Sequence, residues 1–208
     1  MAERAHPDEP GFQDRWQFRL RKGIIPWVSK VRSPYRAAFM WRYNWVSSYC
    51  SNKDVVDVPC GMGWGTSLIR GTRSIIGYDL SPEAVSEAKS RYGSTVKFEV
   101  GDMGKLDLPD ESVDVVSCLE GIEHVPMDVG QRFMTDAHRV LRPGGRLLIS
   151  SPYCRTAPHS GNPYHIHEYQ PDEIHSLING FFKIENCERH DVDLMTVLYL
   201  TCKKDPVA

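Results

Sequence analysis

Short runs of apolar, β-branched residues alternate with segments of helical periodicity from residue 54 onward. Five such runs predict buried strands, at residues 55–58, 74–78, 96–100, 113–118 and 146–150. Strands that alternate with helical patterns are typical of an α/β fold with a mainly parallel sheet. We therefore expect this part of the chain to form one doubly wound domain.

Helix start and stop signals lie between the predicted strands. Ser81 is a favourable N-cap, Pro82 suits the first helical position, and Gly93 provides the stop. Apolar periodicity predicts further helices over residues 133–141 and 174–181, followed by two closing strands that end near Lys203. The Arg-Pro-Gly-Gly sequence of residues 142–145 is expected to end the first of these two helices.

The composition is that of an ordinary globular protein. The 208 residues suffice for one sizeable domain with an extension, and 41% of them are hydrophobic against 25% charged. The six cysteines are far apart and form no CxxC pair, so free thiols in a reducing compartment are expected. The first residues carry charges and prolines in place of an apolar signal, and no segment approaches about 18 uninterrupted apolar residues. We therefore expect a soluble, cytoplasmic protein.

Charge is distributed unevenly along the chain. Residues 15–53 contain nine Lys and Arg, no Asp or Glu, and four of the five tryptophans. Because the whole chain carries a net charge of -2, the remainder sums to -11. We predict a loose tail over residues 1–14, a basic, aromatic helical lid over residues 15–53, and the main domain over residues 54–208.

Three interpretations of the basic segment stay open. Its cations suit a lid that contacts an anionic ligand, with Arg19, Arg21 and Lys22 as candidate contacts. They also suit a solvated amphipathic helix packed on the sheet. A surface for RNA or for an anionic membrane has the same basic and aromatic composition. We favour the small anionic ligand, because the chain carries no added RNA-binding domain.

A glycine-rich turn follows the first predicted strand. It contains glycines at positions 61, 63 and 65, comes shortly after Asp57, and is expected to lead into a helix. This GxGxG pattern differs from the GxGxxG fingerprint of dinucleotide sites. The acid can attract an ammonium group, so the expected ligand is partly cationic. Asp79 ends the next strand, where a carboxylate can hold ribose hydroxyls. Asp102 and Met103 follow the third strand and can hold an adenine, although Asp102 can instead cap a short helix.

The chain from about residue 40 to residue 203 resembles the class I S-adenosylmethionine-dependent methyltransferases. Five blocks carry the resemblance, namely residues 57–65, Asp79, residues 101–102, residues 106–116 and residues 139–145. The resemblance implies a single Rossmann-like sheet of seven mainly parallel strands with an antiparallel last strand, helices on both faces, and S-adenosyl-L-methionine as the cofactor. The expected cofactor contacts are Tyr43, Asp57, Gly61, Gly63, Gly65, Asp79, Leu80, Asp102, Met103 and Glu120.

Two loops resemble the acceptor side of small-molecule methyltransferases from biosynthetic pathways. They are residues 119–125, after the fourth strand, and residues 162–169, after the fifth. Within the second loop, Tyr164 and His167 are the expected contacts to the acceptor.

The chemistry that these loops must perform depends on the acceptor. A carboxylate or phosphate is already ionised and needs no base, whereas a hydroxyl or ammonium group must lose a proton. His124 is the first candidate for that base, followed by Glu123 and His165. Two histidines and a carboxylate, at His165, His167 and Glu168, are a plausible partial set of metal ligands. Because His-x-His without a fixed third ligand is a weak pattern, no metal is expected.

The resulting hypothesis is a single-domain S-adenosylmethionine-dependent methyltransferase that acts on oxygen or nitrogen of a small, anionic metabolite. It is expected to be a monomer or homodimer, without a nucleic-acid or membrane partner. Two alternatives remain, an RNA methyltransferase and a cofactor-binding partner subunit without catalysis of its own.

Overall fold

The computed structural model describes residues 15–21, 25–31, 34–192 and 194–205. Its main sheet has the strand order β5-β4-β3-β6-β7-β9-β8. Strands β3 to β7 pair in parallel, and β9 runs antiparallel to both of its neighbours. The strands are β3 (Asp54–Asp57), β4 (Ser74–Asp79), β5 (Lys97–Val100), β6 (Val113–Leu119), β7 (Leu141–Cys154), β8 (Lys183–Val192) and β9 (Met195–Lys203). This arrangement confirms the expected seven-stranded, doubly wound sheet with an antiparallel last strand.

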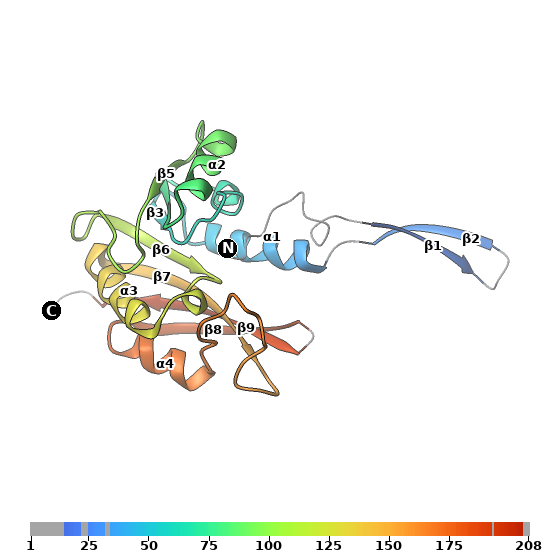
Figure 1. Cartoon of the computed structure of the whole chain (residues 1–208). Coiled ribbons are helices and arrows are strands. Elements are labelled where there is room, and N and C mark those ends of the chain that lie inside the picture. The colour runs from blue at the N-terminus through green and yellow to red at the C-terminus, as the bar shows by residue number, and fades with distance from the viewer. Residues whose placement is uncertain (1–14, 22–24, 32–33, 193, 206–208) are drawn as a thin grey trace.

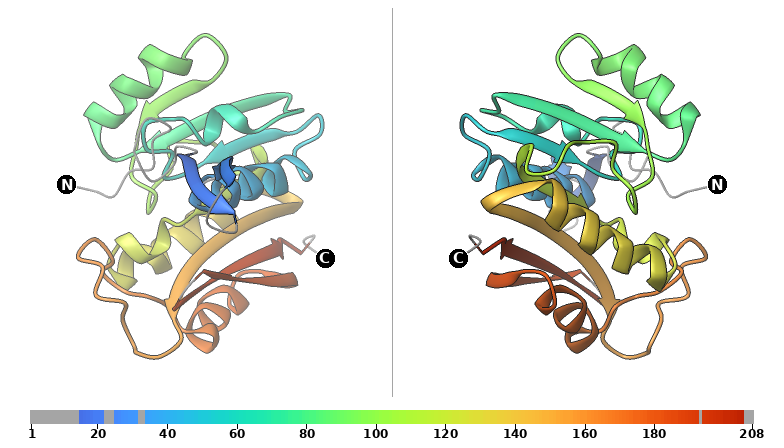
Figure 2. Two further views of the ribbon diagram at one scale, coloured as in Figure 1. Left: turned by 90° about the vertical axis from the view of Figure 1, so that its right-hand side faces the viewer. Right: turned by 90° about the vertical axis from the view of Figure 1, so that its left-hand side faces the viewer.

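Helices cover both faces of this sheet (Figure 2). Alternate residues of each central strand point to opposite faces, so Val56 and Val116 pack with the helices of one side while Val55 and Val115 pack with α1 on the other. The helices are α1 (Pro34–Ser47), α2 (Pro82–Tyr92), α3 (Met127–Val140) and α4 (Pro171–Asn179). Helix α2 begins at the predicted N-cap Ser81, whose side chain accepts a hydrogen bond from the backbone N–H of Ala84. All six cysteines are free thiols, as expected.

Helix α1 belongs to the core of the domain. Phe39 is 5% exposed, and its ring stacks on that of Trp64 at a centroid distance of 4.3 Å. Val46 is fully buried in the same cluster as Val55 and Val115 of the sheet. A movable lid over all of residues 15–53 therefore does not fit this structure, because its last part is built into the core.

The segment before α1 is a β-hairpin, which corrects the expected helical lid. Strands β1 (Arg15–Arg21) and β2 (Ile25–Val31) pair antiparallel, and Figure 1 shows them extending away from the main sheet. Polar and apolar residues alternate strictly along β1, which is the period of a strand and not of a helix. Arg19 and Arg21 lie two residues apart on β1, and Lys22 lies outside the described residues.

One further local expectation was wrong. The glycine-rich turn leads into a single 3-10 turn, η2 (Thr66–Leu68), in place of a full helix. Gly71, at φ +77°, follows too soon for a longer helix, and α1 packs beside this connection. Helix α3 ends at Val140, just before residues 142–145, as expected, and β7 already begins at Leu141. Within the described residues, no helix is both long and apolar enough to cross a membrane.

Packing of α1 into the core predicts a large loss of stability for Phe39→Ala. Removing a buried aromatic ring costs about 3 to 5 kcal/mol, and urea unfolding should show a loss in this range. The matched control is Asn44→Ala on the exposed side of the same helix, which should change the unfolding free energy by less than about 0.5 kcal/mol. Equal, small effects of both substitutions would show that α1 is not part of the cooperative core.

Candidate functional site

The candidate site lies along the carboxyl ends of the parallel strands. Because β3, β4, β5, β6 and β7 run in parallel, the residues that follow them meet at one edge of the sheet. This edge therefore brings together the acids and glycines expected at the cofactor and the Glu-His and His-rich loops expected at the acceptor.

The glycine-rich turn after β3 is tightly enclosed. Gly61 and Gly63 have φ values of +54° and +78°, which favour glycine. A Cβ at Gly63 would lie 2.7 Å from the ring of Phe98, and a Cβ at Gly65 would lie 1.9 Å from the ring of Tyr43. The turn can therefore adopt this path only with glycine at the two crowded positions. Tyr43, an expected cofactor contact, is 7% exposed and forms the wall against Gly65.

Asp57 ends β3 with its carboxyl group buried. One oxygen accepts a hydrogen bond of 2.6 Å from the hydroxyl of Thr66, and the other accepts one of 2.6 Å from Ser117. Burial raises the pKa of Asp57 to about 6, and the two hydroxyl donors oppose that rise. The nearby charge of Asp79 adds to it. Both carboxylate oxygens of Asp57 thus accept hydrogen bonds that join η2 and β6 to β3.

Asp79 joins the end of β4 to the glycine-rich turn. Its carboxylate accepts hydrogen bonds from the backbone N–H groups of Gly61, at 2.8 Å, and Ser81, at 2.9 Å. Leu80 beside it is 70% exposed. An exposed apolar side chain next to a carboxylate suits a ligand that has both an apolar ring and hydroxyl groups.

Asp102 and Met103 follow β5. The Asp102 side chain accepts a hydrogen bond of 2.8 Å from the N–H of Gly104 and thereby closes a turn; no helix follows it. Met103 is 7% exposed and belongs to the core cluster of β3 and α3. The carboxylate of Asp102 is exposed at the edge, and the adenine contact stays a prediction.

Arg42, a half-buried arginine that was not among the expected site residues, lies behind this edge. Burial lowers the pKa of Arg42, but Glu120, Tyr199, Tyr43 and Glu123 together raise it above its usual value. Arg42 comes from α1, so the helix brings a cation to the acids that follow β6. The available signal was its position next to Tyr43 in a helix rich in aromatic residues.

Glu120 follows β6 in a left-handed conformation, at φ +48°. Its carboxylate accepts a hydrogen bond of 2.8 Å from Ser150, and its backbone N–H donates to the same hydroxyl oxygen at 3.0 Å. The side chain is half-buried, and the predicted contact with the cofactor is not tested by these bonds.

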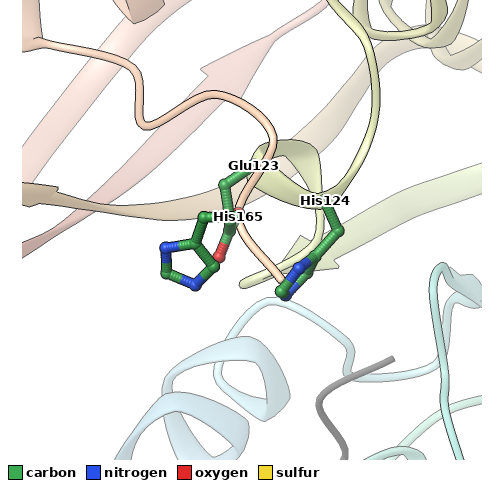
Figure 3. A group of neighbouring side chains, drawn as sticks. All are labelled: Glu123, His124 and His165. Atoms are coloured by element: carbon green, nitrogen blue, oxygen red, sulfur yellow. The ribbon is translucent and has the colours of Figure 1, made fainter. Parts of the chain in front are cut away.

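Glu123, His124 and His165 form a compact cluster beyond Glu120 (Figure 3). Glu123 and His124 lie on the 3-10 turn η3 (Ile122–His124), whereas His165 comes from the loop after β7. One ring nitrogen of each histidine and one carboxylate oxygen of Glu123 all lie within 4.8 Å of one another. The structure thus brings together the three residues that we expected at the reaction centre.

The loop after β7 separates the other residues selected from it. His165 Nδ1 lies 2.6 Å from Oε1 of the buried Glu168. His167 faces elsewhere, with its ring centroid 4.5 Å from that of Tyr169. His165, His167 and Glu168 therefore do not converge as a ligand set. Tyr164 is 42% exposed and accessible to an acceptor.

Known proteins share the central part of this chain. A family model described as a methyltransferase domain matches residues 56–149, from β3 to β7. A protein of Mycolicibacterium smegmatis named "Probable S-adenosylmethionine-dependent methyltransferase" is 36% identical over 150 residues, which cover 69% of this chain and 57% of that protein. The arsenite methyltransferase of Halobacterium salinarum is 31% identical over 140 residues, which cover 64% of this chain and 34% of that protein. The chain thus spans only about a third to a little over half of the length of these relatives.

A solved structure shows the same fold with a different named reaction. The [4+2]-cyclase SpnF superposes with a TM-score of 0.71 at 18% identity, over 83% of this chain and 84% of its own. This likeness concerns the fold alone, and a shared fold does not fix a reaction.

The buried Asp57 predicts a specific pH dependence of stability. Its folded-state pKa, about 6, lies above that of an unfolded aspartate, so the folded protein binds this proton more tightly. The stability that the proton contributes is complete below about pH 4 and is lost as the pH rises through about 6. The unfolding free energy of the wild type minus that of Asp57→Asn should fall by up to about 3 kcal/mol over this range.

Urea unfolding at several pH values measures this difference. Ser117→Ala removes a donor that lowers the Asp57 pKa, and should shift the pH-dependent change to higher pH. A difference between wild type and Asp57→Asn that does not vary with pH would contradict the assignment.

Proposed function

Because this chain belongs to the class I S-adenosylmethionine-dependent methyltransferases, with S-adenosylmethionine as the cofactor, we propose that it methylates oxygen or nitrogen of a small, anionic acceptor. The observation that carries this proposal is the cluster of Glu123, His124 and His165 at the same sheet edge as the cofactor residues. Groups able to bind or deprotonate an acceptor thus follow β6 and β7, while the cofactor groups follow β3 and β4.

Methyl transfer makes few chemical demands on the protein. The sulfonium already carries the leaving group, and the acceptor must approach in line with a free electron pair. The protein therefore has to orient the acceptor, exclude water and provide for the proton of a hydroxyl or ammonium group. The cluster, with a buried carboxylate beside two half-buried imidazoles, provides groups for the first and last of these tasks.

The anionic character of the acceptor is inferred from the N-terminal segment. Residues 15–53 supply nine cations, against a net charge of -11 for the rest of the chain. The β1–β2 hairpin extends toward the same side as the carboxyl end of β6 (Figure 1). Movement of the hairpin over that edge would bring Arg19 and Arg21 toward a bound acceptor. The name of the relative from Halobacterium salinarum refers to a small acceptor, arsenite, which agrees with a small-molecule substrate class.

The cofactor assignment predicts a defined defect for Asp79→Ala. Loss of a charged hydrogen-bonding partner costs about 1.5 to 3 kcal/mol, so calorimetry should show S-adenosylmethionine binding weakened by about one to two powers of ten. Glu87→Ala, which removes an exposed acid from α2, is the control and should bind as the wild type does. Unchanged affinity in a folded Asp79→Ala variant would reject the ribose contact.

The acceptor class is tested with cofactor labelled in its methyl group. We expect the label to enter the small-molecule fraction of a cell extract, and the labelled product to be retained by an anion-exchange resin. A variant that lacks residues 1–33 should transfer the label poorly while it binds the cofactor normally. Label in RNA, with a steep dependence on salt, would favour an RNA methyltransferase. No transfer to any fraction would favour a partner subunit without catalysis. Full transfer by the truncated variant would remove the main support for an anionic acceptor.

A further inference from the structure

We propose that Glu123, His124 and His165 bind one divalent transition-metal ion, of the class of Mn²⁺, Co²⁺ or Zn²⁺. Their ligand atoms lie within 4.8 Å of one another and come from two segments of the chain (Figure 3). Two imidazoles and one carboxylate are a ligand set that such ions accept and that leaves coordination positions open. The binding of the ion stands on this geometry, and only its role toward the acceptor rests on the proposed function.

The distances require a small adjustment. Ligand atoms at about 2.0 to 2.2 Å from an ion stand roughly 3 to 4 Å apart. The ligand atoms must therefore move closer together by roughly an ångström. Rotation of the half-buried His124 side chain toward the other two residues supplies this shift. Glu123 is fully buried, and His165 is almost so, with 9% of its side chain exposed. The ion would therefore meet two fixed ligands and one adjustable ligand.

The hydrogen bonds behind both histidines are those of metal-bound imidazoles. His124 Nδ1 lies 2.9 Å from the backbone oxygen of Tyr164, and His165 Nδ1 lies 2.6 Å from a carboxylate oxygen of Glu168. A ring that donates through Nδ1 carries its electron pair on Nε2, and this is the tautomer that the two partners favour. The amide nitrogen of Asn162 stands 3.1 Å from His165 Nε2 and faces that electron pair, so an ion that binds His165 has to displace this contact.

The loop that carries His165 is fixed to the turn that carries Glu123. The backbone oxygen of Glu123 accepts hydrogen bonds from Ile166, at 2.7 Å, and His167, at 3.1 Å. Glu168, which orients His165, accepts in turn from the backbone N–H of Ser160 at 2.8 Å. These bonds hold the ligands in register without using their metal-binding atoms, which is the support that a preorganised site requires.

A bound ion would change the role of the cluster. An acceptor hydroxyl coordinated to the ion loses its proton to solvent at a lower pH than in water. Its oxygen then forms the bond to the methyl carbon while the carbon–sulfur bond breaks. The electron pair of that bond stays on sulfur, which leaves as a neutral thioether. His124 acts in this reaction as a ligand and no longer as the base.

Metal binding by the untagged full chain tests the proposal without any acceptor. After treatment with a chelator and dialysis, titration with Mn²⁺ or Co²⁺ should show one ion per chain by calorimetry, and Co²⁺ should gain visible absorption. His124→Ala and His165→Ala should each weaken binding by more than about a hundredfold, and Glu168→Gln by about 10- to 100-fold. His175→Ala, a histidine of α4 outside the cluster, should bind the ion as the wild type does.

Affinity for S-adenosylhomocysteine, unchanged in all four variants, would confirm that they fold. Failure of the wild type to bind either ion, or wild-type affinity in both ligand variants, would overturn the metal site while leaving methyl transfer untouched. If the wild type did not bind S-adenosylhomocysteine, this result would count against the proposed function and not against the metal site.

Discussion

The turn between β3 and β4 has no room for side chains at two of its glycines, and this constraint sets the geometry of the sheet edge where we expect the cofactor. A Cβ at Gly63 or Gly65 would come far inside the 3.5 to 4.0 Å at which carbon atoms make favourable contact. The backbone of the turn can therefore lie directly against Phe98 of β5 and Tyr43 of α1. Asp79 then fixes the turn from the side of β4 through the N–H of Gly61. Helix α1 is part of this constraint, because it supplies the wall on which Gly65 packs.

The same helix also sets the charge of the site. Asp57, Glu120 and Glu123 gather at the ends of two neighbouring strands, where burial makes uncompensated negative charge costly. Asp57 meets this cost with two hydroxyl donors and a raised pKa, whereas the two glutamates lie near the Arg42 guanidinium. A segment that we expected to move over the site thus supplies, in α1, its counter-charge. A lid that moves over the site therefore cannot include α1.

Sequence reasoning succeeded where the signal is local. The alternation of strands and helices, the cap at Ser81 and the acids at strand ends each follow from a few adjacent residues. The family resemblance implied the seven-stranded sheet with its antiparallel last strand. It failed where two local patterns compete or where distant residues meet. The basic segment was predicted to be helical although β1 has the period of a strand, and the turn after β3 was expected to lead into a helix that Gly71 and the neighbouring α1 leave no room for. The members of the cluster could be predicted only as separate candidates. His165 is far from His124 along the chain, and the pairing of β6 with β7 brings the two together.

The two proposals for the acceptor side support each other through electrostatics. An anionic acceptor that approached Glu123 directly would meet a buried carboxylate, with Glu120 close behind it and the Arg42 guanidinium as a nearby counter-charge. Coulomb repulsion between like charges a few ångströms apart in a partly dry site is worth several kcal/mol. The cations of the hairpin can attract an anion to the edge. They approach the acceptor from the solvent side, however, and so do not lie between the acceptor and Glu123. A divalent ion held between the carboxylate and the two imidazoles lies where the separation is needed, since it neutralises Glu123 and offers a positive face to the acceptor. An anionic acceptor thus makes the metal site more necessary, and a metal-free cluster would favour an acceptor without charge.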